Sequence, residues 1–108
     1  MPALPREIAD KLDDVRALCE KHRVKRLEIF GSAVKGTFDS GRSDIDLVVE
    51  FLPEPDPLRH GRAYLDLWKA LRRLFDREID LLEVQTLGSS YFARAIDTSR
   101  VEIYDAAA

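Results

Sequence analysis

One segment of this 108-residue chain, residues 44–52, restricts the possible folds more than any other. It reads DIDLVVEFL, and its odd-numbered residues are all apolar, which predicts a β-strand with one buried face. Asp44 and Asp46 fall two residues apart on the opposite face, between apolar neighbours that are typical of a central strand. Two like charges on such a strand require a compensating positive charge, and a hard divalent cation with oxygen ligands is the usual one. The segment therefore predicts a metal site on one face of a sheet.

The rest of the chain predicts helices that alternate with short strands. Apolar spacing favours long helices over residues 5–22 and 57–75, the second with Asp56 as its N-cap and Pro57 in its first turn. The remaining elements are strands over residues 24–30, 77–83 and 101–104, a short helix after Gly31, and another from Ser89 or Ser90 to Ile96. This order predicts an α/β or α+β domain, with a small mixed sheet of about four strands and helices mainly on one face. We expect the functional site on the open face.

Composition excludes several classes of protein. The chain has 17 Lys and Arg against 20 Asp and Glu, a net charge of −3, which argues against a domain whose main task is to coat nucleic acid. No apolar run approaches the ~18 residues that a membrane span needs. The N-terminal residues become polar too early for a signal peptide, and Cys19 is the single cysteine, so no internal disulfide can form. These features predict a soluble, cytoplasmic protein.

A third carboxylate lies in the predicted strand 77–83. Asp80 has apolar neighbours on both sides, as Asp46 does. If the two strands pair, Asp80 stands beside Asp44 and Asp46. Three converging acids suit one or two Mg²⁺ ions held next to a phosphate-bearing substrate.

A glycine-serine pair marks a candidate anion site. Gly31 and Ser32 end the predicted strand 24–30 where a short helix begins, and backbone N–H groups at such a point favour an anion. Lys35 adds a positive charge one turn later. The segment is not a P-loop, because Lys35 precedes Gly36 where that motif requires Gly-Lys-Ser/Thr.

Together these segments resemble the nucleotidyltransferase fold typified by DNA polymerase beta. The resemblance is carried by Phe30-Gly31-Ser32-x-x-x-Gly36, then Ser43-Asp44-Ile45-Asp46-Leu47, then Asp80 on a later strand. The short chain is most similar to the minimal nucleotidyltransferase (MNT) branch, whose members typically act as antitoxins beside an all-helical HEPN-domain toxin. The likeness covers about residues 24–104, so we expect residues 1–108 to form a single MNT domain with that core.

The resemblance implies a role for each matching residue. Three acids would be catalytic and would bind the metal ions: Asp44, Asp46 and Asp80. Four residues would bind the nucleotide, the first two through its β- and γ-phosphates: Gly31, Ser32, Lys35 and Ser43. Lys35 stands where the family commonly has Arg, and the loop over residues 37–42 is about one residue longer than usual.

The activity that the resemblance implies is protein adenylylation. The chain would be an antitoxin that uses Mg²⁺ and transfers AMP from ATP to a hydroxyl, with tyrosine as the expected acceptor, on its cognate HEPN toxin. One alternative is a catalytically idle antitoxin that neutralises its partner by binding alone, although costly idle acids count against it. Another is nucleotide transfer to a small molecule such as an aminoglycoside, which would need an added substrate domain or a dimer. Direct binding of nucleic acid is not expected, and binding of operator DNA by the complex stays open.

Overall fold

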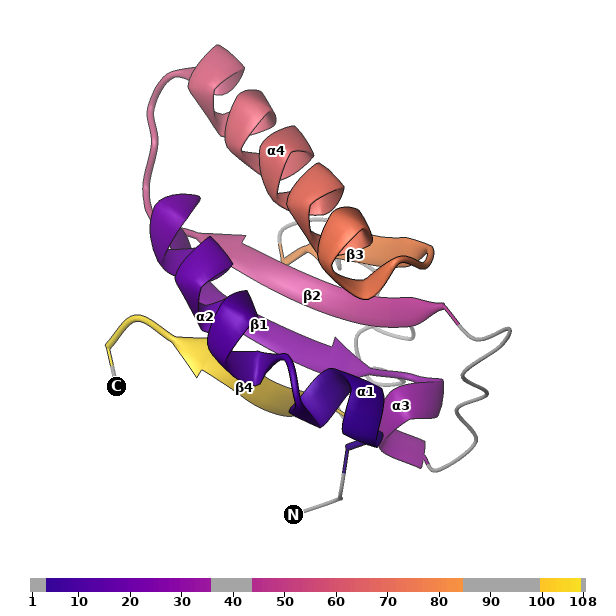
Figure 1. The fold of residues 1–108 in the computed structure, drawn as a ribbon. Coiled ribbons are helices and arrows are strands. Elements are labelled where there is room, and N and C mark those ends of the chain that lie inside the picture. The colour runs from indigo at the N-terminus through magenta and orange to yellow at the C-terminus, as the bar shows by residue number, and fades with distance from the viewer. Residues whose placement is uncertain (1–3, 36–43, 85–99, 108) are drawn as a thin grey trace.

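The protein has a four-stranded mixed sheet at its centre (Figure 1). The computed structural model describes residues 4–35, 44–84 and 100–107. Its strands are β1 (Val24–Phe30), β2 (Ile45–Phe51), β3 (Ile79–Glu83) and β4 (Val101–Asp105), in the spatial order β3-β2-β1-β4. β1 pairs antiparallel with β2 and β4, whereas β2 and β3 are parallel. The predicted mixed sheet is confirmed.

The helices of the described part are α1 (Arg6–Ala9), α2 (Leu12–Lys21), α3 (Ser32–Lys35) and α4 (Pro57–Phe75). The two long helices, α2 and α4, lie side by side on one face of the sheet, as predicted (Figure 1). The α4 helix also supplies the crossover that a parallel β2–β3 pair requires. None of the helices in the described ranges is long and apolar enough to cross a membrane.

The predicted single helix over residues 5–22 is wrong, because the chain leaves the helical conformation between α1 and α2. Lys11 has φ −110° and ψ 9° there. The break lets its Nζ donate to the carbonyl of Leu74 at 2.7 Å, and the ammonium lies 5.7 Å from the centre of the Phe75 ring. A cation at the C-terminus of α4 is electrostatically favourable. Ile8 and Val15, on either side of the break, are both buried.

The α4 helix begins and ends where its local sequence predicts. The Asp56 side chain accepts a hydrogen bond from the Leu58 backbone N–H at 2.9 Å, and Pro57 occupies the first turn. Leu67 and Leu71 are fully buried beneath the helix. The helix ends at Asp76, whose φ of 51° places it in the left-handed region.

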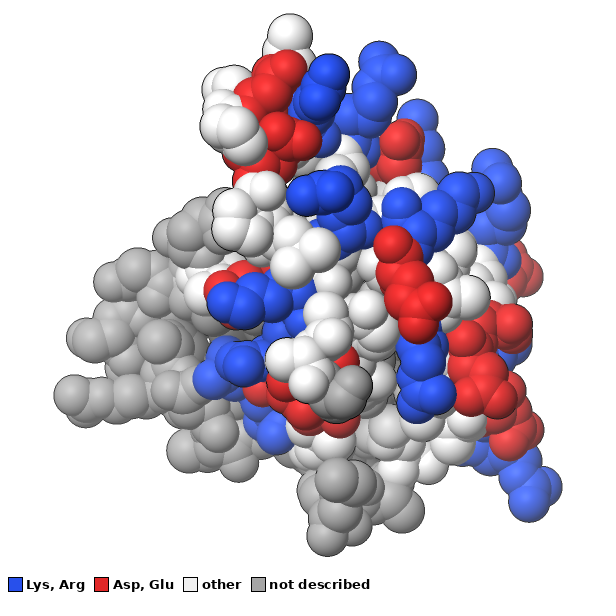
Figure 2. Space-filling view, turned by 90° about the vertical axis from the view of Figure 1, so that its left-hand side faces the viewer, with Lys and Arg blue, Asp and Glu red and all other residues white. Residues whose placement is uncertain are grey.

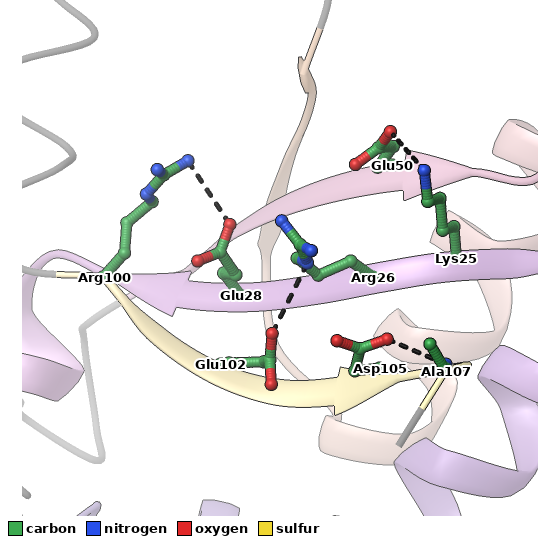
Figure 3. A network of polar contacts seen from close by, with 8 residues as sticks. All are labelled: Lys25, Arg26, Glu28, Glu50, Arg100, Glu102, Asp105 and Ala107. Carbon is green, nitrogen blue, oxygen red and sulfur yellow. Dashed lines mark hydrogen bonds and ion pairs between the residues drawn. The ribbon is translucent and has the colours of Figure 1, made fainter.

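The two faces of the sheet differ in chemistry. One face contributes apolar side chains, including Leu27, Ile29 and Leu47, to a core shared with α2 and α4. On the other face, three ion pairs connect neighbouring strands at 3.3–3.5 Å: Lys25–Glu50, Arg26–Glu102 and Arg100–Glu28 (Figure 3). The acids predicted to face away from the core therefore belong to a polar face.

Candidate functional site

The parallel pairing of β2 and β3 brings two of the predicted acids together. Asp46 and Asp80 are direct partners in the strand register, so their side chains leave the same face of the sheet. Asp44 lies one residue before β2 and is exposed, as Asp80 is, whereas Asp46 is half-buried. Burial, followed by the charges of Asp80 and Asp44, raises the pKa of Asp46 to about 6. The charges of Asp80 and Asp44 thus both act on the Asp46 carboxylate.

The chemistry of these donors suits a hard divalent cation. Carboxylate oxygens are the ligands that Mg²⁺ prefers. A cation would offset the repulsion by Asp80 and Asp44 that adds to the effect of burial on the pKa of Asp46. Within the described residues, no three acidic, histidine or cysteine side chains converge closely enough to hold an ion as they stand. Because Asp44 and Asp80 are exposed, their side chains can change rotamer without disturbing the core.

Gly31 lies directly against the Asp46 carboxylate. A Cβ atom added at Gly31 would collide with Oδ2 of Asp46, and the φ of Gly31 is +75°, a conformation that L side chains rarely adopt. Ser32 follows as the first residue of α3, and buried Ala33 attaches this short helix to the core. The structure therefore places the predicted glycine-serine pair at the acids.

Other predicted site residues are placed only in part. Lys35 is the last residue of α3. Ser43, Gly36, the loop over residues 37–42 and the predicted helix from Ser89 or Ser90 to Ile96 lie outside the described residues.

Two features of this face were missed by sequence reasoning. Phe30 lies opposite Asp46 in the β1–β2 register, is half-buried, and is absent from the described residues that pack in or against the core. The alternation of residues 24–30 could have placed Phe30 on the face of the acids. The second feature is the Arg100–Glu28 pair, which joins two strands, and no local pattern reveals such a cross-strand partner.

Side chains of α4 hold β3, the strand that carries Asp80. The Tyr64 hydroxyl donates to the Leu81 carbonyl at 2.6 Å, and Trp68 Nε1 donates to the Ile79 carbonyl at 3.0 Å. The Glu78 carbonyl points the other way, toward β2, where it accepts a hydrogen bond from the Ile45 N–H. Carbonyls alternate along a strand, so these two aromatic donors satisfy the outer edge of β3.

A further contact joins α4 to the last residue of β3. His60 Nε2 lies 2.7 Å from Glu83 Oε2. Burial, and then the charges of Glu83 and Asp80, raises the pKa of Tyr64. These contacts with α4 therefore hold β3 in its register with β2, and so keep Asp80 beside Asp46.

Comparison with known sequences identifies a protein family and relatives. Residues 15–103 match the family described as Nucleotidyltransferase domain. Two proteins of Methanocaldococcus jannaschii, MJ0128 and MJ1379, which are named as candidate protein adenylyltransferases, are 30% and 27% identical to this chain over 88 residues. Each alignment covers 82% of this chain and 85% of the relative.

Comparison of structures shows the fold. A toxin–antitoxin complex crystallised with AMP-PNP gives a TM-score of 0.66 at 22% identity, covering 87% of this chain and 73% of that chain. A complex of tri-AMPylated HEPN toxin with MNT antitoxin from Shewanella oneidensis gives 0.57 at 17% identity, covering 92% and 73%. A candidate minimal nucleotidyltransferase gives 0.64 at 24% identity, covering 87% and 90%. The expected nucleotidyltransferase fold is confirmed.

Proposed function

This chain belongs to the nucleotidyltransferase domain family, and on that premise we propose that it transfers AMP from ATP to a hydroxyl group of a partner protein, with Mg²⁺ as cofactor. One observation carries the proposal. Asp46 and Asp80 stand side by side on one face of the sheet, with the Gly31 backbone directly against the Asp46 carboxylate. Two acids for a metal thus lie next to a backbone suited to phosphates.

Each residue of the site has a distinct task in this reaction. Asp44, Asp46 and Asp80 would hold the cation, which would polarise the α-phosphate and lower the pKa of the attacking hydroxyl. Gly31 lets the backbone that would bind the phosphates lie directly against Asp46, because any side chain there would collide with the Asp46 carboxylate. Ser32 offers its backbone N–H and its hydroxyl as donors to the same phosphates.

The acceptor oxygen attacks the α-phosphorus, and the bond to the bridging oxygen of pyrophosphate breaks. Asp80 is exposed at this face and accepts the proton of the acceptor hydroxyl. Positioning and charge stabilisation account for most of the rate in such a transfer. Lys35 and Ser43 remain proposed nucleotide-binding residues.

The proposed partner is an HEPN-type toxin, and the proposed acceptor is a tyrosine hydroxyl. Support comes from the solved complex in which an MNT antitoxin accompanies an AMPylated HEPN toxin, and from the names of the archaeal relatives. The use of ATP is supported by the AMP-PNP in a related complex. This chain would then act as the antitoxin of the pair, in the cytoplasm where ATP and Mg²⁺ are available.

A second candidate is an antitoxin that acts by binding alone. It is favoured by one observation, that the described acids do not converge on a common point in their present rotamers. The two candidates differ in what happens to the partner: adenylylation changes its mass, whereas binding alone does not.

The test is label transfer from α-labelled ATP to the co-purified partner, followed by intact mass. We expect one or more added AMP groups with the wild type and none with Asp46→Asn. Glu50→Gln is the matched control, because Glu50 lies on the same strand and face but pairs with Lys25. Equal labelling by all three proteins would contradict catalysis at these acids. An unlabelled partner that stays bound would favour the second candidate.

A further inference from the structure

The exposed face of α4 carries a row of cations that the rest of the fold does not use. Arg62, Lys69 and Arg73 are spaced by seven and four residues, so they lie on one side of the helix, and all three are exposed. Other cations of α4 have partners, such as Arg59 with Asp56 and Arg72 with Glu78. Among the described residues no ion pair involves the three, which we call the cationic stripe.

Two leucines lie in the same row. Leu58 is 84% exposed and Leu65 is 45% exposed, the two highest values among the large apolar residues of the described part. Leu58, Arg62, Leu65 and Lys69 follow one another at intervals of four, three and four residues, which is a single helix face. An exposed apolar pair between cations is typical of a surface that binds a protein.

The stripe is presented on a rigid support. The opposite face of α4 buries Leu67 and Leu71 in the core, and Tyr64 and Trp68 donate hydrogen bonds to β3. None of these contacts uses the residues of the stripe. The 19-residue helix is ~28 Å long, enough to support a partner helix of several turns.

Positive charge predominates on α4. The helix has five basic residues and one acidic residue, Asp66, which is exposed on the same face four residues after Arg62, in a chain whose net charge is −3. Figure 2 shows Lys and Arg in the majority at the upper right, at the height of α4, with some Asp and Glu beside them, and Asp and Glu mixed with further Lys and Arg at the lower right. The acids of the helices below include Glu7, Asp13 and Asp14. A partner that approaches this side is therefore steered to α4 with its acidic surface first.

We propose that the cationic stripe docks an acidic helix of the partner protein. This helix carries Asp or Glu opposite Arg62, Lys69 and Arg73, and apolar side chains over Leu58 and Leu65. The inference rests on the proposed function for the existence of a protein partner. It favours a protein over a nucleic acid, because the two leucines offer nothing to phosphates and the net charge of the chain is negative.

The location suits the reaction. α4 lies on the core side of the sheet, whereas Asp46 and Asp80 leave the opposite face. A helix docked on α4 leaves the acids accessible. Because β3 is an edge strand directly beside α4, another part of the same partner can reach around this edge to the site.

The test measures the affinity of this chain for the product of the adjacent reading frame, the protein used as probe. The stripe variant is R62E/K69E/R73E. Its matched control is R6E/R16E/K21E, which reverses three exposed charges on α1 and α2. We expect the dissociation constant to rise about 100-fold for the stripe variant and less than about 3-fold for the control. Leu58→Ser with Leu65→Ser is expected to raise it about 10-fold.

The outcomes separate this inference from the proposed function. A wild type that forms no complex with the probe overturns both. A complex that forms and is adenylylated, with equal affinity for the stripe variant, overturns the docking inference alone. Equal weakening in both triple variants indicates a non-specific effect of charge and also overturns the docking inference. The docking inference is likewise overturned if the stripe variant loses self-association, or binding to a labelled RNA, without any change in partner affinity.

Folding is checked in the same experiment by the thermal shift that Mg²⁺ and ATP produce, which the stripe variant should retain. If that shift is lost, R62A/K69A/R73A is tested in place of the stripe variant. We expect this variant to bind the partner about 10-fold more weakly, and wild-type affinity would overturn the inference.

Discussion

The two halves of the sheet differ in how their charged side chains are arranged on the polar face. In the β1–β4 half, acids and bases form pairs across the strands, as Arg26 does with Glu102 (Figure 3). In the β2–β3 half, Asp46 and Asp80 are neighbours, and no Lys or Arg of the described ranges forms an ion pair with either. The first half is locally neutral, whereas the second keeps an uncompensated negative charge.

This difference separates structural charge from functional charge. Exposed ion pairs contribute little to stability and are tolerated almost anywhere. Adjacent like charges destabilise the fold, and such groups cluster at functional sites. The supports differ too: β3 is held by donors from α4, whereas β4 pairs irregularly with β1 and borders a hollow of about 490 Å³ beside α2. The strand that carries Asp80, a proposed catalytic residue, is thus the edge strand that the α4 side chains hold.

The largest effect should come from removing an acid of the β2–β3 half. The matched comparison removes an acid of the β1–β4 half. Asp80→Asn should lower the proposed AMP transfer by about 10²- to 10³-fold, because it removes a negative charge from the proposed metal-binding acids. Glu102→Gln should leave transfer within about 2-fold, since Glu102 only pairs with Arg26. Initial rates of labelling at saturating ATP measure both. Similar rates in the two variants would erase the functional distinction between the halves.

A glycine next to the acids should be far less replaceable than one elsewhere. Gly31→Ala should destabilise the protein by about 2–3 kcal/mol, because it combines a positive φ with a collision at Asp46. Gly61→Ala, in α4 with open space around it, should instead stabilise by about 0.5–1 kcal/mol. Urea denaturation gives both free energies of unfolding. A neutral Gly31→Ala would mean that the backbone can move away from Asp46.

The aromatic donors of α4 should matter more than Tyr104, an aromatic residue of β4. Trp68→Phe leaves the Ile79 carbonyl without its donor and should cost about 1–2 kcal/mol, and Tyr64→Phe about 1 kcal/mol. Tyr104→Phe should cost less than about 0.5 kcal/mol. The three free energies of unfolding, measured side by side, rank the two edges. A reversed ranking would show that β4 is the better supported strand.

Stability should fall as pH rises from about 4 to about 6. The carboxyl of Asp46 ionises near 3.8 in the unfolded chain and near 6 in the folded protein, so the folded state holds its proton more tightly. The resulting stabilisation is complete below about 4 and is lost above about 6. Because Asp46 is only half-buried, solvent screening reduces the effect to about 1 kcal/mol.

The matched variant is Asp46→Asn, which should unfold with no such step and should be about 1 kcal/mol more stable than the wild type at pH 8 in the absence of metal. Chemical denaturation at several pH values provides the comparison. An unchanged pH profile in Asp46→Asn would assign the step to another group.

The smallest effect is expected in the paired half. Arg26→Met with Glu102→Gln, in a double-mutant cycle, should give a coupling of about 0.2–0.5 kcal/mol that declines with salt. A coupling above about 1 kcal/mol would mean that this half is held by its charges.

Sequence reasoning succeeded where the determinants are local. The bounds of α4 follow from Asp56, Pro57 and an apolar stripe, and β1 lies at residues 24–30 as predicted. The neighbouring positions of Asp46 and Asp80 could be predicted only on the condition that their strands pair.

What was missed depends on tertiary contacts. The break between α1 and α2 accompanies the reach of Lys11 to Leu74, 63 residues away, which no local pattern contains. The hydrogen bond from Trp68 to the Ile79 carbonyl depends on how β3 lies under α4. Ion pairs such as Arg100–Glu28 likewise need the strand order.

The parallel pairing of β2 and β3 has a consequence for how the protein folds. A parallel pair cannot close through a tight turn, so Asp46 and Asp80 meet only after the whole intervening helix has formed and packed. The unfavourable approach of the two carboxylates is thereby deferred until most of the core is in place. Chains that are only partly folded would lack the paired acids, so the proposed nucleotide binding would report on completion of the native state.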